Sequence, residues 1–367
     1  MKSAQVKTGG QGVLIMAGGT GGHIFPGLAV AEALRHRGIP VRWLGAEGGM
    51  ETRQVPGAGI DLDLVTITGL RGKGLLRWLK MPLMLLRAVW QARRLLEANR
   101  PGCALSFGGY AAAPGGIAAW SKGIPVLVHE QNRIPGLTNR LLTRFARKIL
   151  QGFPGTFPED IHPENSGNPV RKEVAELADP QERFAGRTGP VRLLVTGGSQ
   201  GAMVLNQVVP AALAILPENI EYEVRHQAGA KRLNEALEAY AAAGVQAEVT
   251  PFIDDMAEAY SWADLVICRS GALTVAELAA AGLASVLVPF AHAVDDHQTR
   301  NAEYLANTGA AIILPQASMD ANTVASTLEP LLSDRSVLLS MACAARQLAL
   351  PDAAEKVVDA CSEWVGA

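Results

Sequence analysis

The sequence predicts an α/β protein made of two doubly wound domains, each with a parallel sheet covered by helices. Two observations carry this prediction. Short apolar runs of strand type alternate with glycine-rich turns and helical patterns, which is typical of βαβ units. The alternation also starts afresh in the second half of the 367-residue chain, a length that exceeds what one hydrophobic core usually serves. Abundant Gly and Ala suit helices packed closely on a buried sheet.

The expected strands fall into two series, separated by a turn signal. The first series comprises residues 13–16, 41–44, 104–107 and 126–129, and the second comprises residues 191–196, 221–226, 247–249, 265–268, 285–289 and 311–314. Between them lies Asn168-Pro169, a turn-forming pair. We therefore expect an N-terminal domain of residues 1–168 and a C-terminal domain of residues 169–351. The last helical stretch, residues 353–365, is compatible with either domain.

Charge is distributed unevenly between the two halves. Residues 1–168 carry 20 Lys and Arg against 10 Asp and Glu, whereas residues 169–367 carry 13 against 25. A basic first half suggests an anionic surface or substrate, such as phospholipid headgroups or a diphosphate. The four cysteines have no paired spacing, so we expect neither a disulfide framework nor a zinc site, in keeping with a reducing cytosol. We find no signal-peptide core and no run long enough to span a bilayer.

Two glycine-rich loops are candidate phosphate sites. Gly18–His23 follows the first strand and precedes a helix that we expect to begin near Pro26, and Gly197–Ala202 follows the first strand of the second series. Backbone amides at such a helix start can bind an anion, although a close-packed turn is the simpler alternative. The glycine spacing does not fit a dinucleotide-binding loop. A third loop, Gly108-Gly109-Tyr110, is at least as compatible with a plain turn.

Polar residues gather after two strands of the second series. Glu277 falls one to two turns into the helix expected after residues 265–268, where a carboxylate can accept paired hydrogen bonds from ribose hydroxyls. A solvated helical glutamate is an equal alternative. The polar run 292–301 suggests sugar recognition. Its two histidines and two aspartates, His292, Asp295, Asp296 and His297, lack the spacing of a metal site, so we expect no metal there.

A stretch from Leu64 to Leu96 has no acidic residue and interleaves Lys and Arg with Leu, Met and Trp. This pattern is typical of a segment that lies in the headgroup region of an anionic membrane without crossing it. A core helix with a basic outer face is the alternative. A second acid-free basic set runs from Arg133 to Lys148. No nucleic-acid-binding motif accompanies this charge, so we expect no nucleic-acid partner.

These motifs together resemble those of the peptidoglycan lipid-intermediate N-acetylglucosaminyltransferases, GT-B enzymes that convert lipid I into lipid II. The resemblance covers nearly the whole chain and depends on an ordered set rather than on any single loop. The set is Gly18-Gly19-Thr20-Gly21-Gly22-His23, His129-Glu130-Gln131-Asn132, Gly167-Asn168-Pro169-Val170-Arg171, Gly197-Gly198-Ser199-Gln200-Gly201-Ala202, Ala272-Leu273-Thr274-Val275 and Asp296-His297-Gln298.

The resemblance implies a GT-B fold whose C-terminal domain binds UDP-N-acetylglucosamine (UDP-GlcNAc). The N-terminal domain, joined by a helix of residues 352–367, would bind lipid I. Ile253 would lie near uracil, Glu277 on the ribose, Ser199 on the diphosphate and Gln298 on the sugar. Further donor contacts are implied at Thr20, Gly21, Gly22, Asn132, Arg171, Ala272, Leu273, Thr274, Val275 and Ala276. Acceptor contacts are expected at Gly18, Gly19, Gly108, Gly109 and Tyr110.

The expected reaction is a single in-line displacement at the anomeric carbon, without a cofactor or obligatory metal. His23 is the first candidate for the general base, because an imidazole titrates near neutrality, and Glu130 is the second. The setting implied is peptidoglycan synthesis at the cytoplasmic face of the plasma membrane. Another GT-B enzyme, such as a lipid glucosyltransferase or a UDP-sugar epimerase, and a non-catalytic membrane scaffold are the alternatives.

Two positions depart from the family pattern. Met203 stands where a basic residue is expected after Gly201-Ala202, and Ala276 stands where a serine is common before Glu277. These departures leave the affinity for the donor open.

Overall fold

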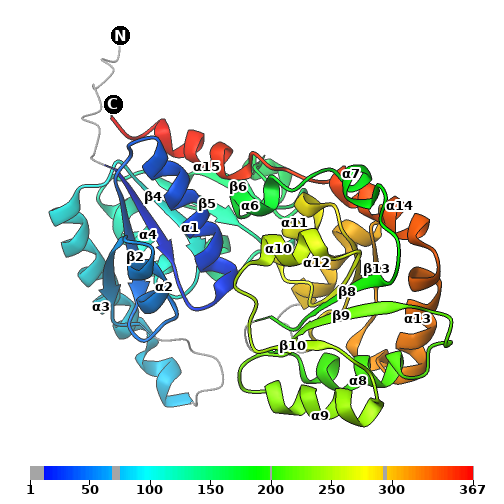
Figure 1. Ribbon diagram of the computed structural model, residues 1–367. Coiled ribbons are helices and arrows are strands. Elements are labelled where there is room, and N and C mark those ends of the chain that lie inside the picture. The colour runs from blue at the N-terminus through cyan, green and yellow to red at the C-terminus, as the bar shows by residue number, and fades with distance from the viewer. Residues whose placement is uncertain (1–11, 68–74, 199–200, 292–295, 367) are drawn as a thin grey trace. The chain divides into compact units, whose positions relative to one another are not determined.

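The computed structural model describes residues 12–67, 75–198, 201–291 and 296–366, with the backbone alone for residues 75–80 (Figure 1). The chain divides into two compact units. The first unit comprises residues 1–169 together with 352–367, and the second comprises residues 170–351. The division after residue 169 lies one residue from the expected boundary. Each unit holds a parallel sheet of its own, as the two series of apolar runs predicted.

The first unit has a seven-stranded parallel sheet in the order β3-β2-β1-β4-β5-β6-β7. Its strands are β1 (Val13–Ala17), β2 (Val41–Ala46), β3 (Asp61–Val65), β4 (Cys103–Gly108), β5 (Val126–Glu130), β6 (Ala146–Gln151) and β7 (Glu164–Asn165). Because β1 and β4 are buried on both faces, their sequences are almost entirely apolar, with Ser106 of β4 as a buried polar residue. The strands β3, β6 and β7 were not predicted, since charged and polar residues interrupt them.

Helices cover both faces of this sheet. The helices are α1 (Gly21–His36), α2 (Glu51–Gly57), α3 (Leu75–Asn99), α4 (Ala112–Ser121), α5 (Leu137–Leu142) and α15 (Ala353–Ser362). Alternate residues of β1 point to opposite sides: Val13 and Ile15 pack with residues of α1 and α15, whereas Leu14 and Met16 pack with residues of α3 and α4. Figure 1 shows α15 (red) beside α1 (dark blue), and Arg37 after α1 pairs with Asp359 and Glu355 of α15.

The first helix begins earlier than expected. Its predicted start near Pro26 is wrong, because α1 already begins at Gly21. Thr20 adopts extended backbone angles, and its carbonyl oxygen accepts hydrogen bonds from the amides of His23 and Ile24. Pro26 therefore lies in the second turn, where it lacks the amide that would bond to the carbonyl oxygen of Gly22.

The second unit has a six-stranded parallel sheet in the order β10-β9-β8-β11-β12-β13. Its strands are β8 (Val191–Thr196), β9 (Tyr222–Gln227), β10 (Glu248–Thr250), β11 (Leu265–Cys268), β12 (Ala284–Leu287) and β13 (Ala311–Ile313). Its helices are α6 (Lys172–Ala175), α7 (Pro180–Phe184), α8 (Met203–Leu213), α9 (Leu233–Ala243), α10 (Met256–Trp262), α11 (Ala272–Ala281), α12 (His297–Ala306), α13 (Ala321–Ser333) and α14 (Arg335–Arg346).

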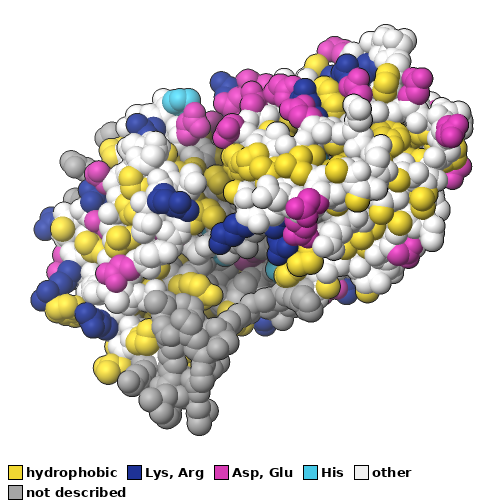
Figure 2. Space-filling model, turned by 60° about the horizontal axis from the view of Figure 1, so that its bottom comes forward, with side chains coloured by type: hydrophobic (Ala, Val, Ile, Leu, Met, Phe, Trp, Pro, Cys, Tyr) yellow, Lys and Arg dark blue, Asp and Glu magenta, His cyan; other side chains and the backbone are white. Residues whose placement is uncertain are grey.

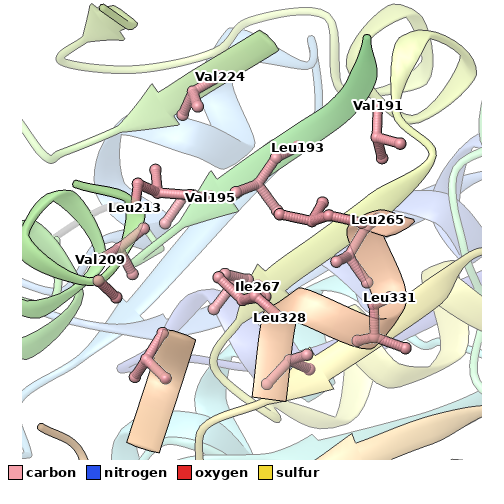
Figure 3. Packing of buried hydrophobic residues seen from close by; sticks show 14 of the residues in the cluster. Val191, Leu193, Val195, Val209, Leu213, Val224, Leu265, Ile267, Leu328 and Leu331 are labelled. Atoms are coloured by element: carbon pink, nitrogen blue, oxygen red, sulfur yellow. The ribbon is translucent and has the colours of Figure 1, made fainter. Parts of the chain in front are cut away.

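One face of the second sheet packs against α8 and α13. Figure 3 shows Leu193 and Val195 of β8 and Ile267 of β11 pointing toward Val209 of α8 and Leu328 of α13. Aspartates cap several helices of this unit by accepting backbone amides, as N-cap residues do. They are Asp179, Asp255, Asp320 and Asp334.

In each sheet the winding reverses direction at one point. The reversal lies between β1 and β4 in the first unit and between β8 and β11 in the second. In doubly wound folds, ligands bind at this point, beyond the carboxyl ends of the strands. The loops after these four strands are therefore the places to look for a site.

Among the described residues, each unit also buries one histidine in a neutral form. His129 donates through Nε2 to the carbonyl oxygen of Gly167 at 2.9 Å and accepts through Nδ1 from Gln131 at 3.0 Å. In the second unit, His226 donates to Asn206 Oδ1 at 3.1 Å and accepts from the Tyr240 hydroxyl at 3.0 Å. Burial lowers the pKa of each imidazole from its ordinary value of 6.5 to about 4.

These histidines predict a loss of stability in mild acid. Below pH 6.5 the unfolded chain binds a proton at each imidazole, whereas the fold does so only near pH 4. Between pH 6.5 and about pH 4, each histidine should therefore lower the free energy of unfolding by about 1.4 kcal/mol for every unit that the pH falls. Urea unfolding at a series of pH values measures the slope. His226→Gln should remove one histidine's share of it, and an unchanged slope would contradict the assignment.

Candidate active site

The glycine loop after β1 presents the start of α1 to solvent. The amides of Gly21 and Gly22 belong to the first turn of the helix, so they have no acceptor within it. Gly19 has a φ of +91°, which an L side chain rarely adopts, and its amide donates to Glu51 at 3.1 Å. The amides available to an anion are therefore those of Gly21 and Gly22, because that of Gly19 points into the protein.

His23 lies in the first turn of α1 and is half-buried. Its Nδ1 is 3.2 Å from the carbonyl oxygen of Gly18 and 3.5 Å from the Thr20 hydroxyl. A carbonyl oxygen can only accept, so Nδ1 carries the hydrogen in the neutral ring. The other nitrogen, Nε2, then has a free lone pair. This edge of the ring packs against Gly108, where an added Cβ would lie 3.3 Å from Nε2. The arrangement suits a group that accepts a proton through Nε2.

Glu130, the second candidate base, is bound on all sides. It ends β5, is 2% exposed, and its carboxylate accepts hydrogen bonds from the Asn132 amide (3.0 Å), the Asn132 side chain (3.2 Å), the Gly136 amide (3.1 Å) and the Asn139 side chain (2.9 Å). A carboxylate has about four acceptor positions, and these donors occupy them. The geometry therefore favours a role for Glu130 in holding the loop that carries Asn132.

The loop after β4 contacts the loop after β1. Gly108 and Gly109 have φ values of +102° and +89°, and a Cβ added at Gly109 would lie 2.2 Å from the carbonyl oxygen of Gly18. The close approach of the two loops thus requires glycine at residue 109. Tyr110 follows with its side chain 47% exposed. The predicted acceptor residues Gly18, Gly19, Gly108, Gly109 and Tyr110 are therefore brought together at one edge of the first sheet.

In the second unit, the glycine loop after β8 is equally tight. A Cβ at Gly197 would lie 2.3 Å from the amide nitrogen of Ala202, and one at Gly201 would lie 2.0 Å from the carbonyl oxygen of Ala228. Met203, which replaces an expected basic residue, starts α8 with its side chain 48% exposed. Ser199, the predicted diphosphate contact, and Gln200 lie outside the described residues.

Glu277 is held by two side chains. Its Oε1 accepts from Arg171 Nε at 3.0 Å and Nη2 at 2.8 Å, and its Oε2 accepts from the Tyr260 hydroxyl at 3.2 Å. Burial and then the charge of Glu277 raise the pKa of Tyr260 well above its usual range, so the phenol remains a donor. Three of about four acceptor positions are occupied. Glu277 is 8% exposed and keeps capacity for a ligand hydroxyl.

The remaining predicted donor residues of the second unit follow the carboxyl ends of strands in its sheet. Residues Ala272 to Ala276 form the start of α11, with Leu273, Thr274 and Ala276 partly exposed. Gln298, in the first turn of α12, accepts the amide of Phe290 at 2.9 Å. Ile253 is half-buried in the loop between β10 and α10. His292 and Asp295 lie outside the described residues. Within the described ranges, no group of three or more His, Cys, Asp or Glu side chains is arranged to hold a metal ion.

Sequence reasoning divided the donor contacts between the two units. Thr20, Gly21, Gly22 and Asn132 belong to the first unit, whereas Arg171, Ile253, Gln298 and the residues of α11 belong to the second.

Sequence reasoning missed three residues that support the site, Glu51, Asn139 and Tyr260. Glu51 was detectable only as an acid that follows Gly48-Gly49 after the second strand. Nothing in the local sequence distinguishes Asn139 or Tyr260, because their partners come from distant segments.

Known proteins match the chain over both units. Residues 13–151 match the glycosyltransferase family 28 N-terminal domain, and residues 192–357 match the corresponding C-terminal domain. A UDP-N-acetylglucosamine–N-acetylmuramyl-(pentapeptide) pyrophosphoryl-undecaprenol N-acetylglucosamine transferase of Xanthomonas axonopodis pv. citri is 59% identical over 347 residues, which is 95% of this chain and 80% of the relative. The equally named protein of Marinobacter nauticus is 55% identical over 350 residues, covering 95% and 96% of the two chains.

Solved structures agree with this relationship. The crystal structure of Acinetobacter baumannii MurG is similar with a TM-score of 0.84 and 41% identity, covering 96% of this chain and 99% of that one. A UDP-GlcNAc 2-epimerase from Neisseria meningitidis has a TM-score of 0.66 at 11% identity, over 96% and 99% of the two chains, and shares the fold alone. The GT-B fold predicted from the sequence is thereby confirmed. The chain is a glycosyltransferase, and it belongs to glycosyltransferase family 28, within the MurG family of N-acetylglucosaminyltransferases.

Proposed function

We propose that this chain transfers N-acetylglucosamine from UDP-GlcNAc to the 4-hydroxyl of the muramyl sugar of lipid I, giving lipid II for peptidoglycan synthesis. The names of its relatives give the donor and the acceptor. The chemistry depends on the orientation of His23. Its Nδ1 faces the Gly18 carbonyl oxygen, so Nε2 is left as a proton acceptor. The ring stands beside the glycine loops that follow β1 and β4.

The reaction is one inverting displacement. The muramyl 4-hydroxyl oxygen bonds to the anomeric carbon of the donor as the bond from that carbon to the UDP oxygen breaks. His23 Nε2 takes the hydroxyl proton, and UDP leaves with the electron pair of the broken bond. Amides at helix starts oppose the charge that grows on the diphosphate, which supports a reaction without an obligatory metal.

The second unit is the donor-binding unit in this proposal. Glu277 accepts a ribose hydroxyl at its open acceptor position, while Arg171 and Tyr260 hold its orientation. Gln298 and the exposed residues of α11 contact the sugar and the diphosphate, Ile253 lies near uracil, and Ser199 contacts the diphosphate. In the first unit, Thr20, Gly21, Gly22 and Asn132 complete the donor contacts.

We further propose that α3 brings the enzyme to an anionic membrane at the cytoplasmic face, as a peripheral protein. Leu83, Leu86 and Trp90 recur at helical spacing and are 72%, 67% and 53% exposed. Arg87 is exposed beside them, and Arg94 stacks on the Trp90 ring at 3.5 Å. Figure 2 shows Lys and Arg side chains spread over the surface of the first unit. Among the described helices, none is both long and apolar enough to cross a bilayer.

The base assignment predicts a specific kinetic defect. His23→Gln should lower the single-turnover rate by about 10²- to 10⁴-fold with lipid I analogue, UDP-GlcNAc and EDTA present, because it removes the proton acceptor. The same substitution should also abolish the acidic limb of the pH profile. The Glu130→Gln variant should keep this limb but have a lower melting temperature. UDP release should require lipid I. An acidic limb that persists in the His23 variant would place the base elsewhere.

The donor site predicts graded losses of UDP affinity. Glu277→Gln should weaken binding by about 10- to 100-fold, because it removes a charged acceptor, and Tyr260→Phe by about fivefold, because it removes one neutral hydrogen bond. Titration calorimetry with UDP measures both. Tyr222→Phe is the matched control, since that hydroxyl donates to the Leu213 carbonyl at the opposite edge of the same sheet. Equal losses in all three variants would contradict the ribose assignment.

The membrane assignment predicts a loss of vesicle binding. Replacing Leu83, Leu86 and Trp90 by Ser should reduce cosedimentation with phosphatidylglycerol vesicles by about tenfold or more, since it removes apolar burial. High salt should weaken binding of the unaltered protein. The control replaces the exposed Ile215 and Leu237 of the second unit by Ser. If the two sets of substitutions have the same effect, α3 is not the membrane-binding surface.

A further inference from the structure

A buried carboxylate lies directly beneath the glycine loop of the first unit. Glu51 begins α2 and is 0% exposed. Its Oε1 accepts the amide of Ala46 at 2.9 Å, and its Oε2 accepts the amide of Gly19 at 3.1 Å. The carboxylate thus connects the end of β2 to the loop that follows β1. None of the reaction steps described above uses this residue.

Three glycines make the space that Glu51 occupies. A Cβ added at Gly18 would lie 2.3 Å from Glu51 Oε1, one at Gly49 would lie 2.2 Å from Oε2, and one at Gly45 would lie 2.7 Å from Cγ. Contacts this short do not occur between real atoms, so each position requires glycine or a different placement of Glu51. The carboxylate is therefore enclosed by backbone from three segments and has little freedom to move.

The peptide between Gly18 and Gly19 connects this carboxylate to His23. Its amide donates to Glu51, and its carbonyl oxygen accepts from His23 Nδ1 at 3.2 Å. In a trans peptide the N–H and the C=O point in opposite directions within one plane. Fixing the N–H toward Glu51 therefore aims the C=O at the imidazole.

We propose that Glu51 is a positioning residue for the transfer reaction, which through the Gly18–Gly19 peptide holds His23 in the tautomer that leaves Nε2 free to accept a proton. The inference depends on the proposed role of His23 as the base. Glu51 does not touch the substrate. It acts by orienting the peptide and by polarising it, since an N–H bonded to a carboxylate makes the carbonyl of the same peptide a stronger acceptor.

Several charged groups and dipoles face His23. The carboxylate of Glu51 lies behind the Gly18–Gly19 peptide, and that of Glu130 lies behind Asn139, whose amide group is near the ring. Both favour the imidazolium form. The amino end of α1, which holds His23, disfavours it. Gly108 on β4 brings no charge. Removal of the Glu51 charge should therefore weaken the Gly18 carbonyl oxygen as the acceptor of His23 Nδ1–H.

Glu51→Gln tests the proposal, because it keeps the size of the side chain and removes its charge. Nitrogen-15 NMR of labelled histidine should show the Nδ1–H tautomer of His23 in the unaltered protein and a mixture of tautomers in the variant. The kcat should fall by about tenfold, with the KM for UDP-GlcNAc within about twofold.

A double-mutant cycle shows whether Glu51 acts through His23. In a His23→Gln background, Glu51→Gln should have no further effect on kcat, because the group that it positions is gone. Additive losses would overturn the proposal. If His23→Gln by itself retains full activity, the base assignment fails, while the NMR measurement still decides whether Glu51 sets the tautomer. Failure of the proposed function and failure of this inference are thereby distinguishable.

Glu47→Gln is the matched control. Glu47 lies four residues earlier, is exposed, and accepts from the Thr66 hydroxyl rather than from the glycine loop. Its substitution should change neither the tautomer nor the rate. If Glu51→Gln does not fold, as judged by thermal unfolding and UDP binding, Glu51→Asp carries the test. It keeps the charge but is one methylene too short to reach both amides. Unchanged nitrogen shifts at His23 in a folded Glu51 variant would overturn the proposal.

Discussion

Parallel strands all end at one edge of their sheet, and in both units a buried carboxylate fastens a loop at that edge. Glu51 accepts amides of β2 and of the first glycine loop, Glu130 accepts donors of the Asn132 loop, and Glu277 accepts Arg171 and Tyr260. A carboxylate removed from water is costly unless hydrogen bonds replace its hydration. The loops cannot shift without leaving such a charge unpaired. The rigidity of the ligand-facing edges follows from this constraint.

The three carboxylates differ in what surrounds them. Glu51 is enclosed by three glycines and accepts two backbone amides, so it is unavailable to a ligand. Glu130 is unavailable for another reason, because four donors occupy its acceptor positions. Glu277 is held by side chains and retains an open acceptor position, which is what recognition of a sugar hydroxyl requires. Residue type alone therefore does not separate a supporting acid from a binding acid. The space around the carboxylate and the kind of donor that it accepts do.

The sequence predicted the central strands well and the marginal ones poorly. Strands such as β8 and β11 are buried on both faces and read as apolar runs, so even their ends were placed correctly. β3 lies at a sheet edge, where Asp61 and Asp63 pair with Arg42 of β2. Because these acids alternate with apolar residues, the strand was not recognised in the sequence. The start of α1 was misplaced because Pro26 suggested a first turn, whereas the glycines before it are helical.

The loops of the site could be predicted from the sequence, but the residues that hold these loops in place could not. Glycines after a strand and an acid in the following helix can be recognised within a short window of sequence. The environment of Glu51 cannot, because β1 and β2 become neighbours only in the folded sheet. The same holds for Tyr260, which meets Glu277 from another helix. Tertiary contacts decide these roles, and a single sequence does not contain them in readable form.

The return of α15 to the first unit has a consequence for how the chain matures during translation. Val357, Val358 and Cys361 are buried in the core beside β1 and α1. They follow the whole of the second unit along the chain, so the ribosome adds them after residues 170–351. Domains usually fold in the order of synthesis. Here the second unit is fully synthesised while the first still lacks part of its core. The first unit therefore completes its core only after the second unit has been made.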